Sequence, residues 1–404
     1  MEKVIIVGGG QAAASLAHKM RSLGFDGALT MMCEEKTPPY QRPPLSKKYL
    51  LGEMALERLY LRPEHYYVEQ NITLHLGERV NAIDRQNNEI ITEKGQYAYD
   101  RLVLATGSTP RLLPAHLGGT LENVFSVRDL KDADSLAPHM KEGKRLLIIG
   151  GGYIGLEAAA VAAARGMDVT LIEMSERILQ RVAAPQTSDY FRSLHQSHGV
   201  TIKEQTGLTR LLGQNGQVVG AELSDGSTLE IDLAILGIGI TPATNLAQDC
   251  GLAFENGIRV DALGRSSDPN IWAAGDCCSF PYKDGYLRLE SVPNAIDQAE
   301  VIAQNIMGAE IAYIPKPWFW SDQYDVKLQI AGLNTGYDKI IERKNPTLLS
   351  QSFWYYAQDT LIAVDAMNDP RAYMVAKKLI ESGLTPDPAL VEDASSNLKD
   401  LLKQ

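Results

Sequence analysis

The chain has 404 residues, of which 45% are apolar and 22% are charged, and its formal net charge is −11. A chain of this size can bury a large core and should divide into two or three domains. The acidic balance argues against nucleic acid as the main partner. No apolar run approaches membrane-spanning length, and the first predicted strand begins at Val4. We therefore expect a cytoplasmic protein without a signal peptide.

The order of apolar segments predicts an α/β fold with two Rossmann-like dinucleotide-binding domains. Short apolar strands that alternate with helical patterns are typical of doubly wound parallel sheets. Helical patterns at 11–23 and 154–165 fill the first two crossovers. The predicted strands are Val4–Val7, Leu29–Met32, Leu102–Ala105, Leu146–Ile149, Val169–Ile172, Leu233–Leu236 and Ile271–Ala274.

Two glycine-rich turns, VIIVGGGQAAA from Val4 and LLIIGGGYIGLE from Leu146, each follow one of these strands. In such a turn the first glycine bends the chain and the second lets the backbone approach a pyrophosphate. A small third residue allows close helix packing, and the phosphates face the helix N-terminus. The three positions are Gly8, Gly10 and Ala13 in the first copy, and Gly150, Gly152 and Gly155 in the second. The pattern predicts two bound dinucleotides.

An acidic residue about 20 positions further on binds a ribose hydroxyl in this kind of fold. In the second copy the segment DVTLIE ends at Glu173. In the first copy ALTMMCEE ends at Glu34 or Glu35. Because a carboxylate repels a 2′-phosphate, Glu173 favours NADH over NADPH. Arg177, four residues later, is the opposing signal, since it can serve a phosphate.

The two repeats extend beyond the glycine turns. RLVLATGSTP (101–110) and LAILGIGITP (233–242) share a strand, a glycine and a terminal Thr-Pro. The strand NIWAAGDC, which ends near Asp276, is predicted to return to the first sheet, so that the second repeat is inserted into the first. From Trp318 the alternating stretches and a helical pattern at Ala372–Ser382 predict an antiparallel α+β domain. The predicted domains are 1–115 with 243–317, 116–242, and 318–404.

Six segments carry a resemblance to a known family: YQRPPLSKKYL (40–50), LATG (104–107), GGGYIGLE (150–157), AAGDC (273–277), ESVPNAIDQA (290–299) and PWFWSDQY (317–324). With them the chain resembles the glutathione-reductase-type flavoproteins. Within these it is similar to the NADH-dependent ferredoxin reductases of bacterial oxygenase systems, the putidaredoxin-reductase-like group. PPLSK and WFWSDQ are specific to this branch. The resemblance implies FAD in the first dinucleotide domain and NADH in the second. It also implies a [2Fe–2S] ferredoxin acceptor that supplies a haem monooxygenase or related oxygenase.

The resemblance also implies FAD contacts. They come from Gly8, Gly10, Ala12, Ala13, Glu34, Arg42, Lys47, Val80, Ala105, Thr106, Gly107, Arg128, Asp276, Val292 and Trp320. Asp276 ends a strand, where its carboxylate can accept hydrogen bonds from the ribityl hydroxyls; the alternative is an Asp-initiated turn. Ser291 is a predicted helix N-cap with Pro293 in the first turn, so that Val292 aims backbone N–H groups at the flavin.

The implied NAD contacts are Gly150, Gly152, Tyr153, Ile154, Gly155, Glu157, Glu173, Gly237, Ile238 and Gly239. The implied catalytic residues are Lys47, Glu157 and Trp320. We predict an ion pair between Lys47 and Glu157 near flavin N5; the alternative is a solvated Lys47 and an ordinary early-helix acid. Trp320 is expected beside the isoalloxazine and Tyr153 over the nicotinamide pocket. Either aromatic side chain can instead belong to the core.

Cysteine placement suggests a one-electron acceptor. Disulfide reductases of this superfamily carry a reactive cysteine after the first ribose acid, but the segment KTPPYQRPPLSKKYL has none. A disulfide between the adjacent Cys277 and Cys278 would be strained, so we expect both to be structural and Cys33 to lie in the core. A flavin without a thiol relay can release electrons singly to an iron–sulfur protein.

A local charge of +4 between Lys36 and Arg62 would steer an acidic ferredoxin. The alternative is that these basic side chains contact FAD phosphate or are merely solvated. Two other functions stay open: a redox-responsive flavoprotein resembling apoptosis-inducing factor, and an NADH reductase of small quinones or oxygen. We expect a monomer, with a dimer as the alternative, and no metal site.

Overall fold

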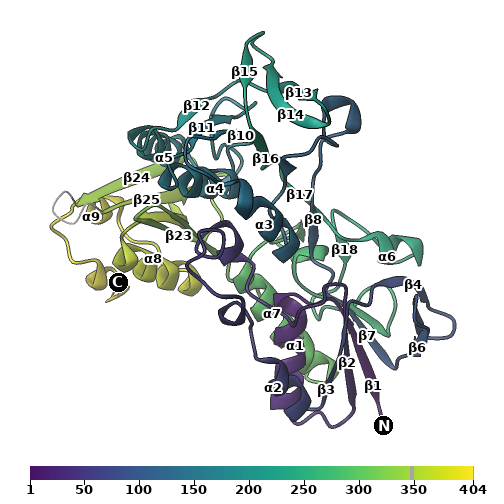
Figure 1. The fold of residues 1–404 in the computed structure, drawn as a ribbon. Coiled ribbons are helices and arrows are strands. Elements are labelled where there is room, and N and C mark those ends of the chain that lie inside the picture. The colour runs from purple at the N-terminus through teal and green to yellow at the C-terminus, as the bar shows by residue number, and fades with distance from the viewer. Residues whose placement is uncertain (346–349, 404) are drawn as a thin grey trace. The chain divides into compact units, whose positions relative to one another are not determined.

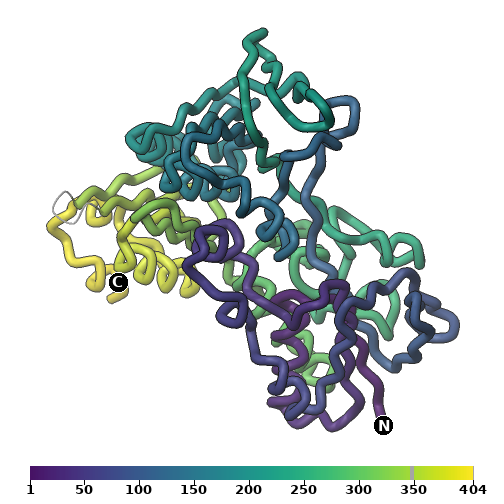
Figure 2. The backbone as a smooth tube through the Cα atoms, in the orientation of Figure 1, coloured from purple at the N-terminus to yellow at the C-terminus, as the bar shows by residue number. Residues whose placement is uncertain are grey.

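The structure is a computed structural model that describes residues 1–345 and 350–403. It divides into two compact units, each assembled from three stretches of chain. Unit 1 comprises Met1–Arg42, Ala55–Thr109 and Ile240–Pro317, and unit 2 comprises Pro43–Met54, Pro110–Gly239 and Trp318–Gln404. The chain can be followed through these stretches by colour in the ribbon and the backbone tube (Figures 1 and 2). The three-domain division made from the sequence stays a prediction.

Unit 1 is built on a five-stranded parallel sheet in the order β19-β7-β1-β2-β3. Its strands are β1 (Lys3–Val7), β2 (Ala28–Cys33), β3 (Ile72–Leu76), β7 (Arg101–Leu104) and β19 (Ile271–Ala273). The predicted return of the 271–274 strand to this sheet is confirmed, because β19 pairs with β7. The strand order changes direction between β1 and β7, which is where ligands bind in open α/β sheets.

Helix α1 (Gln11–Ser22) follows the first glycine turn and packs against α7 (Val292–Ile306) (Figure 1). The alanine-rich start of α1 suits this close approach, since Ala13 and Ala17 are fully buried. The other helices and strands of unit 1 are α2 (Glu64–Glu69), β4 (Val80–Asp84), β5 (Glu89–Thr92), β6 (Gln96–Ala98), α6 (Asn245–Asp249), β18 (Ile258–Arg259), β20 (Cys278–Tyr282) and β21 (Gly285–Leu287). Strands β8 (Ser108–Pro110) and β17 (Ile240–Pro242) lie at the chain positions where the units meet in sequence.

Unit 2 repeats the parallel arrangement in the order β12-β11-β10-β16-β9. The strands are β9 (Val124–Phe125), β10 (Arg145–Ile149), β11 (Asp168–Ile172), β12 (Thr201–Lys203) and β16 (Leu233–Leu236). Their helices are α3 (Leu130–Leu136), α4 (Tyr153–Ala164) and α5 (Pro185–Ser197), and β13 (Leu208–Gln214), β14 (Gln217–Leu223) and β15 (Thr228–Glu230) form a separate antiparallel sheet. Helix α4 is apolar on nearly every side and is buried over Gly155–Ala162, as expected for a helix that packs within a unit.

The C-terminal part of unit 2 is an antiparallel sheet in the order β22-β23-β26-β25-β24. It consists of β22 (Trp318–Gln323), β23 (Val326–Gly332), β24 (Lys339–Asn345), β25 (Ser350–Ala357) and β26 (Thr360–Met367), followed by α8 (Pro370–Ser382) and α9 (Pro388–Glu392). Asp369 caps α8 by accepting a hydrogen bond from the Ala372 N–H, and Gly383 ends that helix in the left-handed conformation. The antiparallel α+β character predicted from the sequence is confirmed. Across the described residues, none of the helices is both long and apolar enough to cross a bilayer.

Candidate functional site

The first glycine turn leaves β1 at the point where β7 ends. Gly8 adopts a φ of +138°, and a Cβ at this position would lie 2.2 Å from the Ala105 carbonyl oxygen, so only glycine fits. By contrast, a Cβ on Gly10 would meet no atom within 4 Å. The turn is therefore closed toward the sheet and open on the face from which a pyrophosphate approaches the start of α1. This geometry fits a dinucleotide, as the sequence predicts.

Asp276 lies just after β19 and accepts a hydrogen bond from Ser108 Oγ at 2.9 Å. The preceding residue, Gly275, is fixed by its own N–H, which donates to Gln298 on α7. A Cβ on Gly275 would lie 3.1 Å from the Ala12 Cβ, so α1 and this turn approach each other closely. The carboxylate is thus held at the carboxyl end of the sheet beside the first glycine turn.

The predicted cap of α7 is present. Ser291 Oγ accepts a hydrogen bond from the Asn294 N–H, and Pro293 lies in the first turn. Val292 is the first residue of this helix, so its N–H belongs to the group that an α-helix leaves without an internal partner. Such a terminus stabilises negative charge on a ligand.

The end of β2 carries a cysteine at the position where the second repeat has an acidic residue. Strand pairing aligns Val7 with Met32 in unit 1 and Ile149 with Ile172 in unit 2, so Cys33 occupies the place that Glu173 has in the second repeat. Both predicted acids follow this cysteine. Glu34 is exposed and lies 3.1 Å from Arg79, whereas Glu35 is half-buried and pairs with Arg42 at 2.6 Å. The FAD contacts proposed for Glu34 and Arg42 stay predictions.

The remaining predicted FAD residues divide between the units. In unit 1, Thr106 Oγ1 donates to the Ala243 carbonyl, Gly107 has a φ of +69°, and Val80 is buried at the start of β4. Lys47, Arg128 and Trp320 belong to unit 2. Arg128 precedes the N-cap of α3 and donates its N–H to Asp132.

In the second glycine turn both the first and the third positions leave no room for a Cβ. A Cβ on Gly150 would lie 2.4 Å from the Gly237 carbonyl oxygen, and one on Gly155 would lie 2.1 Å from the Gly150 carbonyl oxygen. Gly152 is open, as Gly10 is. Gly239 also requires a glycine-type backbone, with a φ of +96°. The turn and the adjacent segment Gly237–Gly239 therefore bring bare backbone to one edge of the sheet.

Glu173 is held in place by two backbone N–H groups. Its Oε2 accepts from Gly151 and its Oε1 accepts from Ser175, both at 2.8 Å. Arg177, the residue that favoured a phosphate, donates instead to Ser188 Oγ and to the Ala183 carbonyl. The cation is thus engaged elsewhere, which strengthens the preference for NADH drawn from Glu173.

Tyr153 is the first residue of α4, and its ring packs against Phe319 with the ring centroids 5.0 Å apart. Its hydroxyl is buried and has no hydrogen-bond partner among the described residues. Burial also raises the pKa of Tyr153 well above its ordinary value. A buried phenol without a partner is costly, so this ring is a candidate to be displaced by a ligand. The neighbouring Ile154 is exposed.

The ion pair predicted between Lys47 and Glu157 is present in unit 2, with Lys47 Nζ 2.6 Å from Glu157 Oε2. Glu157 lies in α4 and its side chain is only 6% exposed. Ser46 Oγ donates to Oε2 at 2.9 Å and Ser321 Oγ donates to Oε1 at 2.7 Å. A buried carboxylate with three donors is the arrangement that such a charge requires.

The two serines were not found from the sequence as site residues. Both lie within the motifs that carried the family resemblance, PPLSK and WFWSDQ, and that is the only signal that could have indicated them. Trp320 precedes Ser321 on β22 and is half-buried, with its ring close to those of Trp318 and Phe319. Its placement beside the isoalloxazine stays a prediction.

All four cysteines are free thiols. Cys33, Cys277 and Cys278 are fully buried, as expected, and burial raises the pKa of Cys33 to about 12. A thiol with such a pKa is neither nucleophilic nor easily oxidised. In the structure these sulfurs contact backbone carbonyls, for example Cys277 with the Leu104 oxygen.

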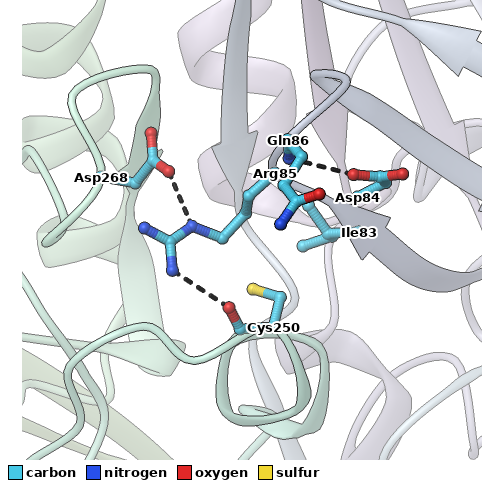
Figure 3. A pocket seen from close by; sticks show the side chains of 6 residues that line it. All are labelled: Ile83, Asp84, Arg85, Gln86, Cys250 and Asp268. Carbon is cyan, nitrogen blue, oxygen red and sulfur yellow. Dashed lines mark hydrogen bonds and ion pairs between the residues drawn. The ribbon is translucent and has the colours of Figure 1, made fainter.

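A hollow of about 550 Å³ in unit 1 lies away from these groups and is lined by Ile83, Asp84, Arg85, Gln86, Cys250 and Asp268 (Figure 3). The Arg85 Nε donates to Asp268 at 2.7 Å and its Nη1 donates to the Cys250 carbonyl at 3.1 Å. Because the guanidinium joins these segments to one another, we interpret it as structural.

Comparison with known proteins agrees with this geometry. Residues 2–299 match the model of the pyridine nucleotide-disulphide oxidoreductase family, and residues 318–402 match that of the reductase C-terminal family. The chain therefore belongs to the pyridine nucleotide-disulphide oxidoreductases that carry this C-terminal domain. Membership confirms the predicted fold class and the predicted cofactors, FAD and NADH.

Several relatives match over their whole length. A ferredoxin–NAD(P)⁺ reductase of Sphingomonas sp. is 41% identical, with 96% of this chain and 95% of the relative covered. Putidaredoxin reductase of Pseudomonas putida is 40% identical, with 99% and 97% covered. Among solved structures, the covalent putidaredoxin reductase–putidaredoxin complex matches with a TM-score of 0.96 at 39% identity, covering 100% of this chain and 98% of that one. The ferredoxin reductase of the CYP199A2 system from Rhodopseudomonas palustris matches with a TM-score of 0.95 at 36% identity, covering 99% of both chains. The resemblance inferred from the sequence is confirmed.

Proposed function

We propose that this chain takes hydride from NADH and passes the electrons, one at a time, to a [2Fe–2S] ferredoxin that supplies a haem monooxygenase or related oxygenase. The observation that carries the proposal is the full-length match, at about 40% identity, to reductases named for the ferredoxins they reduce. Bound FAD supplies the change from a two-electron donor to a one-electron acceptor. The protein residues supply binding, orientation and charge.

Unit 1 would hold FAD through the first glycine turn, Asp276 and the N-terminus of α7. The open face at Gly10 fits a pyrophosphate, and the Asp276 carboxylate fits hydroxyl groups. The N–H groups at the start of α7 would favour the ligand when it carries negative charge. The first glycine turn follows β1 and Asp276 follows β19, so these two groups lie at the carboxyl end of the parallel sheet.

Unit 2 would hold NADH through the second glycine turn and Glu173. The carboxylate is already oriented by the Gly151 and Ser175 N–H groups, so it loses little freedom on accepting hydrogen bonds from a ribose. Tyr153 would move to admit the nicotinamide ring. The Lys47–Glu157 pair would orient the reacting groups, with Lys47 as the charge that faces them and Glu157 as its anchor.

No cysteine is assigned a role in electron transfer. The segment from Lys36 to Leu50 contains none, and the buried thiols of Cys277 and Cys278 have raised pKa values because of their burial. A dithiol relay would need a thiolate. The absence of a cysteine in this segment supports direct transfer to a metal centre. We also propose that the protein works in the cytoplasm, where NADH is available and four free thiols would persist.

The acceptor can be tested by measuring NADH-dependent cytochrome c reduction with and without a purified [2Fe–2S] ferredoxin, alongside reduction of a small dye and of oxygen. The proposal predicts rapid cytochrome c reduction only when ferredoxin is added. Equal rates without ferredoxin, or faster reduction of the dye or of oxygen, would instead indicate a reductase of small acceptors. A long-lived complex with NADH that does not turn over would indicate a redox-responsive protein.

A further inference from the structure

Unit 2 contains a continuous run of hydrogen bonds that ends at Glu157. Ser321 Oγ lies 2.7 Å from Glu157 Oε1, and Gln323 Nε2 lies 3.1 Å from Ser321 Oγ. His195 Nε2 lies 2.8 Å from Gln323 Oε1, and the Tyr324 hydroxyl lies 3.2 Å from His195 Nδ1. We call these four residues, Tyr324, His195, Gln323 and Ser321, the donor chain.

The run has one direction. Gln323 donates its amide N–H to Ser321, so the single hydroxyl proton of Ser321 is free to point at the Glu157 carboxylate. The Gln323 amide oxygen must then receive the Nε2–H of His195, and this fixes the tautomer of the ring. Nδ1 of that tautomer is an acceptor, which suits the Tyr324 hydroxyl. Every donor therefore points toward Glu157.

The surroundings keep this arrangement in one state. His195, Gln323 and Ser321 are completely buried. Burial lowers the pKa of His195 to about 4, although the hydrogen bond to Gln323 opposes this, so the ring is neutral at pH 7. Two titratable groups act on the ring: Tyr324 packs edge-on against it, and His198, which is stacked on Tyr324, also lowers the His195 pKa. A neutral ring can act as donor and acceptor at once, as the chain requires.

The donor chain explains an unusual feature of each of two residues, His195 and Tyr324. His195 is a polar residue on the buried side of α5, where an apolar residue would serve packing alone. Tyr324 occupies the turn between β22 and β23 with a φ of +55°, a conformation that favours glycine or asparagine and is costly for an aromatic residue. A side chain that contributes a specific hydrogen bond gives a reason for each.

We propose that His195 and Gln323, acting through Ser321, are positioning residues for Glu157. The Ser321 hydroxyl engages Oε1 and leaves Oε2 to Lys47 and Ser46, so the carboxylate has one orientation and presents Lys47 in one place. The inference rests on the proposed role of the Lys47–Glu157 pair in hydride transfer. It extends that role to α5, whose residue His195 is 38 positions from Glu157 in the sequence.

The direction of the hydrogen bonds in the donor chain can be tested without any turnover. Long-range ¹H–¹⁵N spectra of histidine-labelled, FAD-bound protein report which ring nitrogen is protonated, and loss of one signal in His195→Leu assigns the residue. The proposal predicts an Nε2–H tautomer that stays neutral from pH 8 down to about 5, because the His195 pKa lies near 4. An Nδ1–H tautomer, or protonation near pH 6.5, would overturn the proposed direction.

The effect on Glu157 can be tested with Ser321→Ala and Gln323→Glu, by stopped-flow reduction of the flavin by NADH. Ser321→Ala removes the last donor. Gln323→Glu keeps the shape, but its carboxylate accepts from Ser321 and so turns that hydroxyl away from Glu157. Both variants should slow flavin reduction by about tenfold, the usual effect of losing one hydrogen bond to a charged group. Ser321→Thr, which keeps the hydroxyl that Ser321→Ala removes, should reduce the flavin at the rate of the unaltered protein.

Gln196→Ala is the matched control, because Gln196 is exposed and lies next to His195 on the same helix. Its rate should equal that of the unaltered protein. Unchanged rates in both Ser321→Ala and Gln323→Glu, with folding and FAD content preserved, would overturn the positioning role. If the variants slow flavin reduction but ferredoxin is not reduced even by the unaltered protein, the donor chain stands and the proposed acceptor is wrong.

Discussion

The two dinucleotide repeats share their backbone plan, and two of the positions at which they differ bear on the ligand site. In both, a strand ends on a glycine whose N–H donates to the second strand, namely Gly8 to Met32 and Gly150 to Ile172. The third position of the turn is Ala13 in the first repeat and Gly155 in the second. The residue that follows the aligned part of the second strand is Cys33 in the first repeat and Glu173 in the second.

These differences show how one plan serves two ligands. In the second repeat the helix lies so close to the turn that a Cβ cannot be placed, and a carboxylate is fixed at the strand end. In the first repeat a buried thiol packs against Gly9 instead, and the acids come one and two residues later. If the proposed roles hold, the second repeat selects the nicotinamide nucleotide at its own strand end, whereas in the first repeat the acids that could contact a ribose lie in the loop after β2.

The largest expected effect concerns Asp365, which contacts helix α5 of the second repeat. It accepts hydrogen bonds from Thr187 on α5 and from Tyr355, and burial raises its pKa to about 6 from 3.8. The folded state therefore keeps a proton that the unfolded state has released, and the free energy of unfolding falls as pH rises from about 4 to about 6. The expected loss is about 3 kcal/mol, and Asp365→Asn should abolish it.

Urea unfolding at several pH values measures this difference. Asp359 is an exposed acid in the β25–β26 turn, and Asp359→Asn is the control. In this variant the free energy of unfolding should fall with pH as steeply as in the unaltered protein. If the free energy of unfolding falls equally with pH in the unaltered protein and in Asp365→Asn, the burial of Asp365 has no effect on stability.

The next largest effect is expected at the third position of the glycine turns, where Gly155 in the second repeat corresponds to Ala13 in the first. Gly155→Ala places a methyl group 2.1 Å from the Gly150 carbonyl oxygen, so the helix must move away from the turn. We expect a loss of about 2 kcal/mol in stability and weaker NADH binding. The reciprocal change, Ala13→Gly, should cost only about 1 kcal/mol, the ordinary penalty of glycine in a helix, and leave NADH binding intact. Thermal unfolding and NADH titration test both; equal effects on NADH binding would contradict the comparison.

A smaller effect is expected at Glu173. Glu173→Ala should lower kcat/KM for NADH by about tenfold, because a charged acceptor for the ribose is lost, while kcat/KM for NADPH should stay the same or rise. Glu176→Ala, an exposed neighbour, serves as control. Unchanged selectivity in steady-state assays with both nucleotides would remove the case for NADH built on this residue.

The smallest effect is expected at Cys33, the counterpart of Glu173. Burial raises the pKa of Cys33 to about 12, so iodoacetamide at pH 8 should not modify it in the folded protein. Cys33→Ala should keep NADH-dependent flavin reduction within about twofold. Mass spectrometry of the treated protein and the stopped-flow rate provide the readouts. Rapid alkylation with loss of activity would indicate a thiol in the electron path.

The sequence was sufficient for features with a local pattern. Glycine spacing and apolar runs predicted four strands of the first parallel sheet and three of the second, and the segments PPLSK and WFWSDQ indicated the family. The offset at Cys33 escaped prediction because it depends on strand register, which a count of residues after Ala13 does not give. The donor chain escaped because His195 is far in the sequence from Ser321, Gln323 and Tyr324, and all four are far from Glu157, so that only folding joins them.

The most direct test of the account is the electron stoichiometry of one turnover. The FAD-bound protein would be reduced anaerobically with one equivalent of NADH, mixed with excess oxidised [2Fe–2S] ferredoxin, separated from the ferredoxin, and then denatured for a thiol count. The account predicts two reduced ferredoxins for each NADH and four free thiols before and after the reaction. Fewer thiols in the oxidised protein than in the reduced protein, or failure of the NADH-reduced protein to reduce ferredoxin, would contradict it.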